Sequence, residues 1–116
     1  MSTLRTQETK AIYDAYIAQG GLEDACVLCT SDVLKSFTYW KIIANRFPYD
    51  RIAKVHDMIL PLRHVTENDL TEAERDELHS IKTAYLNEHY DVFLEASSRL
   101  KTVPAHFHLH LIVLKD

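Results

Sequence analysis

The stretch that most constrains the fold lies near the end of the chain, where PAHFHLHLIVL runs from Pro104 to Leu114. Histidines alternate there with apolar residues, and a period of two is the period of a β-strand, whose successive side chains point to opposite faces. One face then carries His106, His108 and His110, and the other carries Phe107, Leu109 and Leu111. The apolar face predicts a core contact, so we expect the histidine face to look into a cleft or onto another layer.

The spacing also limits what the three histidines can bind together. His106 and His110 are four residues apart, which on a strand corresponds to roughly 13 Å. A zinc–imidazole bond is only about 2.0–2.1 Å long. A metallohydrolase with one catalytic zinc held by all three histidines is therefore disfavoured, and we expect the three to have different tasks.

Composition excludes several classes of protein. The 116 residues predict one domain, and 47% hydrophobic and 26% charged residues are ordinary for a soluble globular protein. The net charge of −4 and the absence of a Lys/Arg block disfavour DNA or RNA as a partner. Gly20 and Gly21 are the only glycines, which excludes a Gly-rich phosphate loop. No apolar run is long enough to span a membrane, the N-terminus has no apolar signal region, and we expect a cytoplasmic location.

The remaining pattern predicts a helix from about residue 3 to 19 that packs on the main body. Its apolar stripe consists of Leu4, Ala11, Ile12, Ala15, Tyr16 and Ala18. Strands are predicted at 37–44, at 55–60, where Pro61 ends the strand, and at 90–96. A capping box at Thr71 and Glu74 predicts a helix from there to about Glu88. This order predicts an α+β fold with an antiparallel sheet.

Two cysteines, Cys26 and Cys29, form a Cys-x-x-Cys pair. Two thiolates at this spacing can bind one tetrahedral zinc ion, but a structural zinc site needs two further ligands, which here must be histidines or carboxylates. A thioredoxin-like redox pair is the rival interpretation, and it would need a helix that opens at the first cysteine within a βαβ unit. The third interpretation is that the two cysteines are inert buried thiols.

Several of these segments together resemble the histidine-triad (HIT) family. The family signature, His-φ-His-φ-His-φ-φ with φ apolar, is matched from His106 to Ile112. The run WKIIANRFPY, which includes Asn45, is similar to the family strand whose terminal Asn faces the nucleotide. The run VHDMILPLRHV is similar to Gly-His-x-x-φ-φ-Pro-x-x-His, with Val55 in place of the glycine. The cysteine pair resembles the zinc-binding subset of the family.

The resemblance implies a single HIT-like domain over residues 1–116, with an N-terminal helical arm at 1–21 and a zinc-stapled catalytic body at 22–116. The fold would be α+β, with an antiparallel sheet, one long helix between strands and an additional N-terminal helix. In the zinc-bearing members the equivalent residues hold a structural zinc ion in a closed site, which implies the ligand set Cys26, Cys29, His64 and His106. No organic cofactor is implied.

The resemblance also implies the chemistry. His108 would attack the α-phosphorus of a nucleoside 5′-phosphate derivative and form a covalent nucleotidyl–histidine intermediate. His110 would donate to the phosphate oxygens, and His56 would sit behind His108 and fix its tautomer. Asn45 would face the ribose or phosphate, and Ile43 and Phe47 would line the base pocket.

The family's Gly-Gln-Ser stretch ahead of the triad is absent here, and Thr102 is the nearby hydroxyl that could take its place. The implied activity is that of a nucleoside phosphoramidate or dinucleoside polyphosphate hydrolase, or a nucleotidyl transferase. The alternative is a zinc-stapled nucleotide-binding module without catalysis. The resemblance implies a homodimer that binds a nucleotide or nucleotide conjugate.

Overall fold

The computed structural model describes residues 2–21, 26–97, 99–100 and 103–116. Its strands are β1 (Val33–Ser36), β2 (Trp40–Ala44), β3 (Ala53–Pro61), β4 (Val92–Leu94) and β5 (Leu109–Leu114). Its helices are α1 (Gln7–Ala18), α2 (Val27–Thr30), α3 (Glu72–Ile81) and α4 (Asn87–His89), with short 3-10 turns η1 (Ser2–Leu4) and η2 (Glu67–Asp69) and a π-helical segment η3 (Lys82–Leu86). Within the described residues, no helix is long and apolar enough to cross a membrane.

The strands form one antiparallel sheet in the order β1-β2-β3-β5-β4. Strand β3 is central, and Met58 stands opposite Ile43 on β2 and His110 on β5. The predicted antiparallel α+β fold is confirmed. The sequence did not predict β1, whose four residues are all exposed and therefore lack the alternation that marks a half-buried strand.

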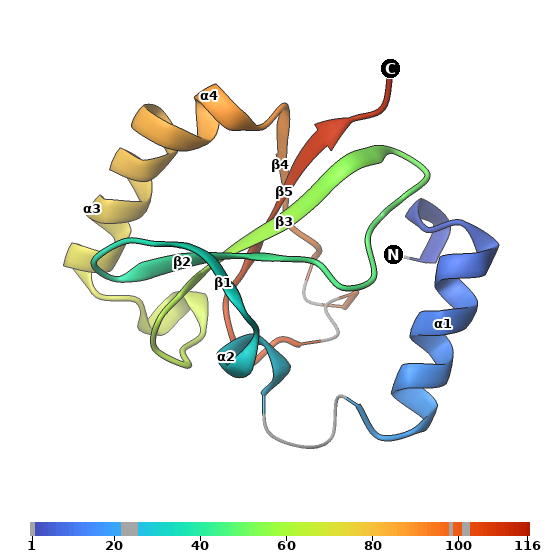
Figure 1. Ribbon diagram of the computed structural model, residues 1–116. Coiled ribbons are helices and arrows are strands. Elements are labelled where there is room, and N and C mark those ends of the chain that lie inside the picture. Colours follow the sequence, from blue (N-terminus) through green and yellow to red (C-terminus); the bar gives the residue numbers. More distant parts are fainter. Residues whose placement is uncertain (1, 22–25, 98, 101–102) are drawn as a thin grey trace.

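Helices α3 and α4, linked by η3, cover one face of the sheet (Figure 1). Trp40 on β2 is fully buried beneath α3 and its indole N–H donates to the Glu74 carbonyl at 2.8 Å. The expected apolar face of the histidine strand packs between the sheet and the helices in one hydrophobic cluster. This cluster includes Trp40, Ile42, Ile59, Leu70, Ile81, Leu86, Phe107, Leu109 and Leu111.

The predicted capping box is confirmed at the start of α3. The Thr71 hydroxyl accepts from the Glu74 N–H at 3.1 Å, and the Glu74 carboxylate accepts from the Thr71 N–H at 2.8 Å. The helical path continues through η3 and α4 to His89, close to the predicted end. Strand β2 starts later than predicted, because Phe37 N–H bonds the Trp40 carbonyl and residues 37–39 form a turn.

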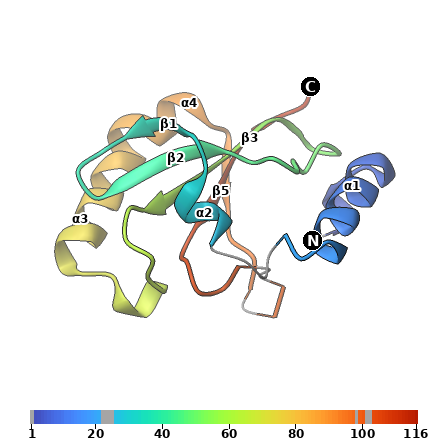
Figure 2. The ribbon, with the colours of Figure 1, turned by 60° about the horizontal axis from the view of Figure 1, so that its bottom comes forward.

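The other face of the sheet carries α2, and α1 lies beside the β2–β3 connection (Figures 1 and 2). Leu28 of α2 packs on Ile43, Met58 and Leu60. Figures 1 and 2 show α1 beside the segment that joins β2 to β3, at the far end from α3. The predicted packing face of this helix is wrong at its aliphatic positions, since Ile12 and Ala15 are exposed and no residue of α1 is buried, but Tyr16 of the same stripe does pack on Phe47. The contacts are made by polar and aromatic groups instead, because the Asp50 carboxylate accepts from Thr6 and Thr9 at the helix start.

Candidate active site and metal-binding cluster

A cavity of about 770 Å³ opens on the histidine side of the sheet. Its lining includes five residues that the sequence pointed to, Ile43, Asn45, Phe47, His108 and His110. Thr102, the remaining candidate for nucleotide contact, lies outside the described residues. The cavity exceeds the lower limit of typical small-molecule sites, which is about 300 Å³, so a nucleotide-sized ligand fits by volume.

The position of His108 fixes the protonation of its ring. Its Nδ1 lies 2.9 Å from the backbone carbonyl of His106. A carbonyl can only accept, so Nδ1 carries a proton, and in the neutral form of the ring the lone pair is on Nε2. His108 is buried and lines the cavity. An imidazole in this tautomer has a nucleophilic nitrogen at its outer end.

His56 and His110 form a hydrogen-bonded pair whose proton order can be deduced. The Tyr49 backbone N–H donates to His56 Nδ1 at 2.9 Å, so the proton of neutral His56 must be on Nε2. His56 Nε2 lies 2.8 Å from His110 Nδ1 and therefore donates to it. The proton of neutral His110 is consequently on Nε2, whose nearest described partner is the Tyr49 hydroxyl at 3.4 Å. His110 thus presents an N–H donor at the cavity end.

Both members of this pair are neutral at neutral pH. Burial and, to a smaller extent, the charge of Arg5 together lower the pKa of His56 from 6.5 to about 4. Burial lowers the pKa of His110 to about 3, with contributions from His56 and His108. A second proton on His110 would face the His56 Nε2–H along the 2.8 Å contact, and a second proton on His56 would face the Tyr49 backbone N–H at 2.9 Å. The pair is therefore built to donate a proton in a hydrogen bond while remaining uncharged.

The expected contact of His56 is corrected by the structure. We expected His56 behind His108, whereas its triad hydrogen bond goes to His110. The strand register explains the difference, because His56 stands opposite Ile112 and His110 is the diagonal neighbour on the same face. His108 lies two residues before His110 in the chain. His56 therefore orients the third histidine of the motif.

Asn45 directly follows β2, at the point where the chain enters the cavity wall. Its carboxamide oxygen accepts from the Phe47 N–H at 2.8 Å, which is a local turn-forming bond. Its NH₂ group lies 3.3 Å from His56 Nε2 and 3.6 Å from Met58 Sδ. The structure thus brings Asn45 to the histidine pair, where it also borders the cavity.

Cys26, Cys29, His64 and His106 come together although they are far apart in the chain, and their ligand atoms all lie within 4.8 Å of one another. His106 Nδ1 is 3.5 Å from Cys26 Sγ and 3.3 Å from Cys29 Sγ. Tetrahedral bonds of 2.3 and 2.05 Å would separate a sulfur and a nitrogen ligand by about 3.6 Å. The distances therefore fit a four-coordinate metal ion bound by these four residues.

The tautomer of His106 also suits a ligand. Its Nε2 lies 2.9 Å from the Pro61 carbonyl and so carries the proton, which leaves the Nδ1 lone pair directed at the two thiols. Both cysteines are free. Helix α2 begins directly after Cys26, which the sequence did not predict, but it is a single turn and not the long helix of a thioredoxin-like site.

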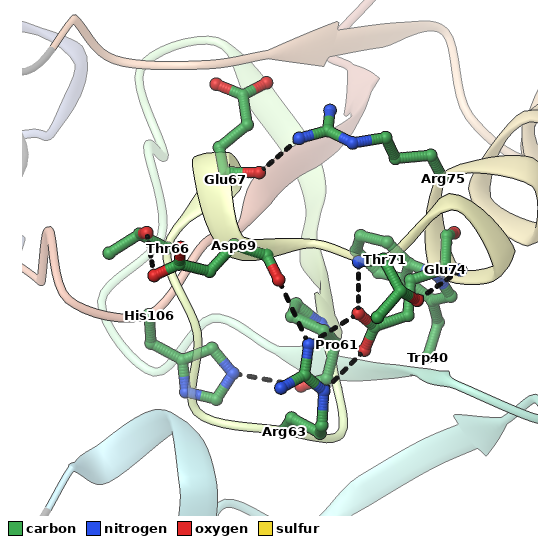
Figure 3. A network of polar contacts seen from close by, with 10 residues as sticks. All are labelled: Trp40, Pro61, Arg63, Thr66, Glu67, Asp69, Thr71, Glu74, Arg75 and His106. Atoms are coloured by element: carbon green, nitrogen blue, oxygen red, sulfur yellow. Dashed lines mark hydrogen bonds and ion pairs between the residues drawn. The ribbon is translucent and has the colours of Figure 1, made fainter.

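The segment that carries His64 is fixed by a polar network (Figure 3). Arg63 donates from Nε and Nη2 to the Glu74 carboxylate at 3.0 and 2.7 Å, and from Nη2 to the Asp69 carbonyl. The hydrogen bonds from Arg63 hold the pKa of Glu74 at about 2. Glu74 therefore stays ionised, and the loop between Pro61 and α3 is held against the helix at the residue next to His64.

The sequence did not indicate that the N-terminal segment contributes to the cavity. Arg5, Tyr13 and Tyr16 line it. Tyr13 and Tyr16 pack on Phe47, with ring centroids 5.0 and 4.9 Å apart. Tyr16 belongs to the predicted apolar stripe of this helix, and Tyr13, three residues earlier, lies on the same side of the helix.

The chain has a HIT-like α+β fold. A HIT family hydrolase from Clostridium thermocellum, Cth-393, matches the structure with a TM-score of 0.59 at 20% identity, covering 80% of this chain and 93% of that one. A protein described as a Hit Like Protein gives a TM-score of 0.51 at 20% identity over 84% and 93% of the two chains. HTC1 gives 0.58 at 16% identity over 97% and 76%. No protein-family model and no curated protein matches the sequence. At these identities the similarity establishes the fold.

Proposed function

We propose that the protein is a HIT-type nucleotide hydrolase or nucleotidyl transferase that uses His108 as its nucleophile. The observation that carries this proposal is the protonation pattern at the cavity. In its neutral form His108 has its lone pair on Nε2, because its Nδ1–H is held by the His106 carbonyl, and neutral His110, which lines the same cavity, carries its proton on Nε2. A nucleophile beside a donor for developing negative charge is what phosphoryl transfer through an intermediate requires.

In the first step His108 Nε2 attacks the α-phosphorus of a nucleoside 5′-phosphate derivative. A nitrogen–phosphorus bond forms, and the bond from phosphorus to the leaving atom breaks with its electron pair remaining on that atom. His110 Nε2–H donates to a non-bridging oxygen, and His56 keeps it in the donating tautomer. In the second step water, or another acceptor in a transferase, displaces His108 and releases the nucleoside monophosphate group. Asn45, Ile43 and Phe47 would contact the nucleoside.

We further propose that the metal-binding cluster holds a structural zinc ion. Two cysteines and two histidines leave no open coordination position, which is typical of structural zinc and not of catalytic zinc. The ion would tie α2 to the segment before β5, where His106 precedes the nucleophile by two residues. Free thiols and metal ligation suit a reducing compartment, in keeping with a cytoplasmic location. We also propose that residues 1–116 act as one HIT-like domain and that two copies form a homodimer.

The test is intact-protein mass spectrometry after brief mixing with nucleoside phosphoramidates and dinucleoside polyphosphates. We expect a transient adduct of one nucleoside monophosphate on the wild type and none on His108→Ala. His79→Ala is the matched control, since His79 is an exposed histidine of α3 outside the cavity lining, and it should form the adduct.

The outcomes separate the two functional classes. An adduct that His108→Ala lacks and that also names the base would establish covalent catalysis at His108. If the wild type binds nucleotide but gives neither adduct nor turnover, the protein is a nucleotide-binding module and the enzymatic proposal is wrong.

A further inference from the structure

Arg5 is a buried cation in the cavity wall whose charge is not neutralised within the described residues. The side chain is 8% exposed, and neither of the ion pairs found among the described residues involves it. Its guanidinium carbon lies 4.1 Å from the Tyr13 ring centre and 4.8 Å from the Tyr49 ring centre. Cation–π contacts offset part of the cost of burial, but a buried charge normally has an anionic partner.

The donors of Arg5 are incompletely used. Nε–H donates to the Phe47 carbonyl at 2.8 Å, and in the described part of the chain neither terminal amino group has a hydrogen-bond partner. No fully buried side-chain nitrogen or oxygen among the described residues lacks a partner. The terminal amino groups must therefore reach open space, and the open space that Arg5 lines is the cavity.

The backbone around Arg5 is held in place independently of any ligand. The next residue, Thr6, is the N-cap of α1, and its N–H and hydroxyl both donate to Asp50 at 2.8 and 3.0 Å. The Arg51 N–H donates to the Leu4 carbonyl at 3.0 Å on the other side. Arg5 is therefore presented to the cavity from a fixed position, as a preorganised binding group needs to be.

The geometry assigns Arg5 to a phosphate of the substrate beyond the α-phosphate: we infer that the site selects nucleotides whose leaving group is itself phosphorylated, over nucleotides that release an amine. This inference rests on the proposed function of the same site.

The distances favour a second phosphate over the reacting one. His108 and His110 already supply the nucleophile and the donor at one end of the cavity. Arg5 is separated from them by Tyr49, whose ring centre lies 4.8 Å from the guanidinium carbon and 5.0 Å from the His110 ring centre. A guanidinium keeps its donors in its own plane and matches phosphate oxygens in pairs. A fixed cation at this distance also disfavours a protonated amine as a neighbour.

The experiment compares diadenosine tetraphosphate with adenosine 5′-phosphoramidate, and the guanosine equivalents, in the wild type, Arg5→Gln, Arg5→Lys and Arg51→Gln. The measured quantity is the ratio of kcat/KM for the polyphosphate to that for the phosphoramidate. We expect Arg5→Gln to lower this ratio by roughly 10–100-fold, since hydrogen bonds to charged groups are that strong. Arg5→Lys should recover part of it. Arg51 is exposed and outside the cavity lining, and glutamine keeps the main-chain N–H that bonds the Leu4 carbonyl, so Arg51→Gln should leave the ratio at its wild-type value.

A ratio that stays constant in Arg5→Gln, because both substrates lose activity equally or neither does, would overturn the inference, since Arg5 would then only support the fold. If the wild type turns over neither substrate, the proposed function fails, and binding decides the inference. Calorimetry would then compare ADP with AMP. A preference for ADP that Arg5→Gln removes and Arg51→Gln keeps supports the role of Arg5, and equal affinities in the wild type refute it.

Discussion

Replacing His56 with glutamine should make the stability of the protein less sensitive to acid. Burial lowers the pKa of folded His56 from 6.5 to about 4. Between these values the unfolded chain takes up a proton that the folded protein does not. The free energy of unfolding of the wild type therefore falls as the pH is lowered, by about 1.4 kcal/mol per pH unit for this one group.

The variant lacks this contribution, so the stability gap between the two proteins should narrow on acidification. Taking the folded pKa as about 4, the wild type loses about 2 kcal/mol more than His56→Gln between about pH 7 and pH 5. The metal ligands are the same in both proteins, and their effects cancel in the difference. His110 changes the stability gap in the same direction. Removing His56 removes one of the neighbours that lower the pKa of His110, so His110 also makes the variant less sensitive to acid.

Urea unfolding at several pH values, with the free energy taken from midpoint and slope, measures this gap. His79→Gln is the control and should track the wild type at each pH, since solvent reaches the His79 ring in the folded protein. A gap between wild type and His56→Gln that stays constant or widens towards acid would refute the claim that His56 is held neutral.

Three further predictions concern the metal-binding cluster and the helix and sheet contacts. Chelation of the purified protein should lower Tm by at least about 10 °C, zinc should restore it, and Cys29→Ser should respond to neither; an unchanged Tm in the wild type would contradict a structural metal. Thr71→Ala should cost about 1 kcal/mol of stability in urea and Thr71→Ser much less, because only the alanine removes the capping oxygen; equal losses would argue against the capping box. Tyr90 donates to the buried Asp57 carboxylate at 2.6 Å, so Tyr90→Phe should cost about 1–3 kcal/mol, while Tyr39→Phe, at an exposed side chain, should cost nothing measurable.

The sequence was sufficient where a local pattern determines a position. The alternation around His108 predicted a strand and the burial of Phe107 and Leu111, but β5 begins only at Leu109, so His106 and His108 lie in the segment before it. The spacing of Thr71 and Glu74 predicted the start of α3. The cluster of Cys26, Cys29, His64 and His106 was predicted from motif resemblance, and their ligand atoms do converge. Each of these rests on short-range periodicity or on a fixed set of residue types.

What the sequence could not supply depends on register and on tertiary contacts. The partner of His56 follows from which residues of β3 and β5 stand opposite one another, and no local pattern contains that information. The fully exposed β1 has no apolar face to mark it. The orientation of α1 was mispredicted because its link to the body runs through Asp50 and aromatic rings, while hydrophobic periodicity reports only apolar burial. For the same reason the hydrophobic pattern did not mark Arg5 as a residue of the cavity.

The hydrogen bond from the Tyr49 backbone to His56 has a consequence for sequence variation. The donor that orders the protons of both histidines is a main-chain N–H, so it does not depend on which side chain the residue carries. It also does not titrate at any pH at which the protein is folded. Nineteen of the twenty amino acids could stand at position 49 and supply the same N–H. Proline alone would remove it and leave the tautomers of the pair undefined.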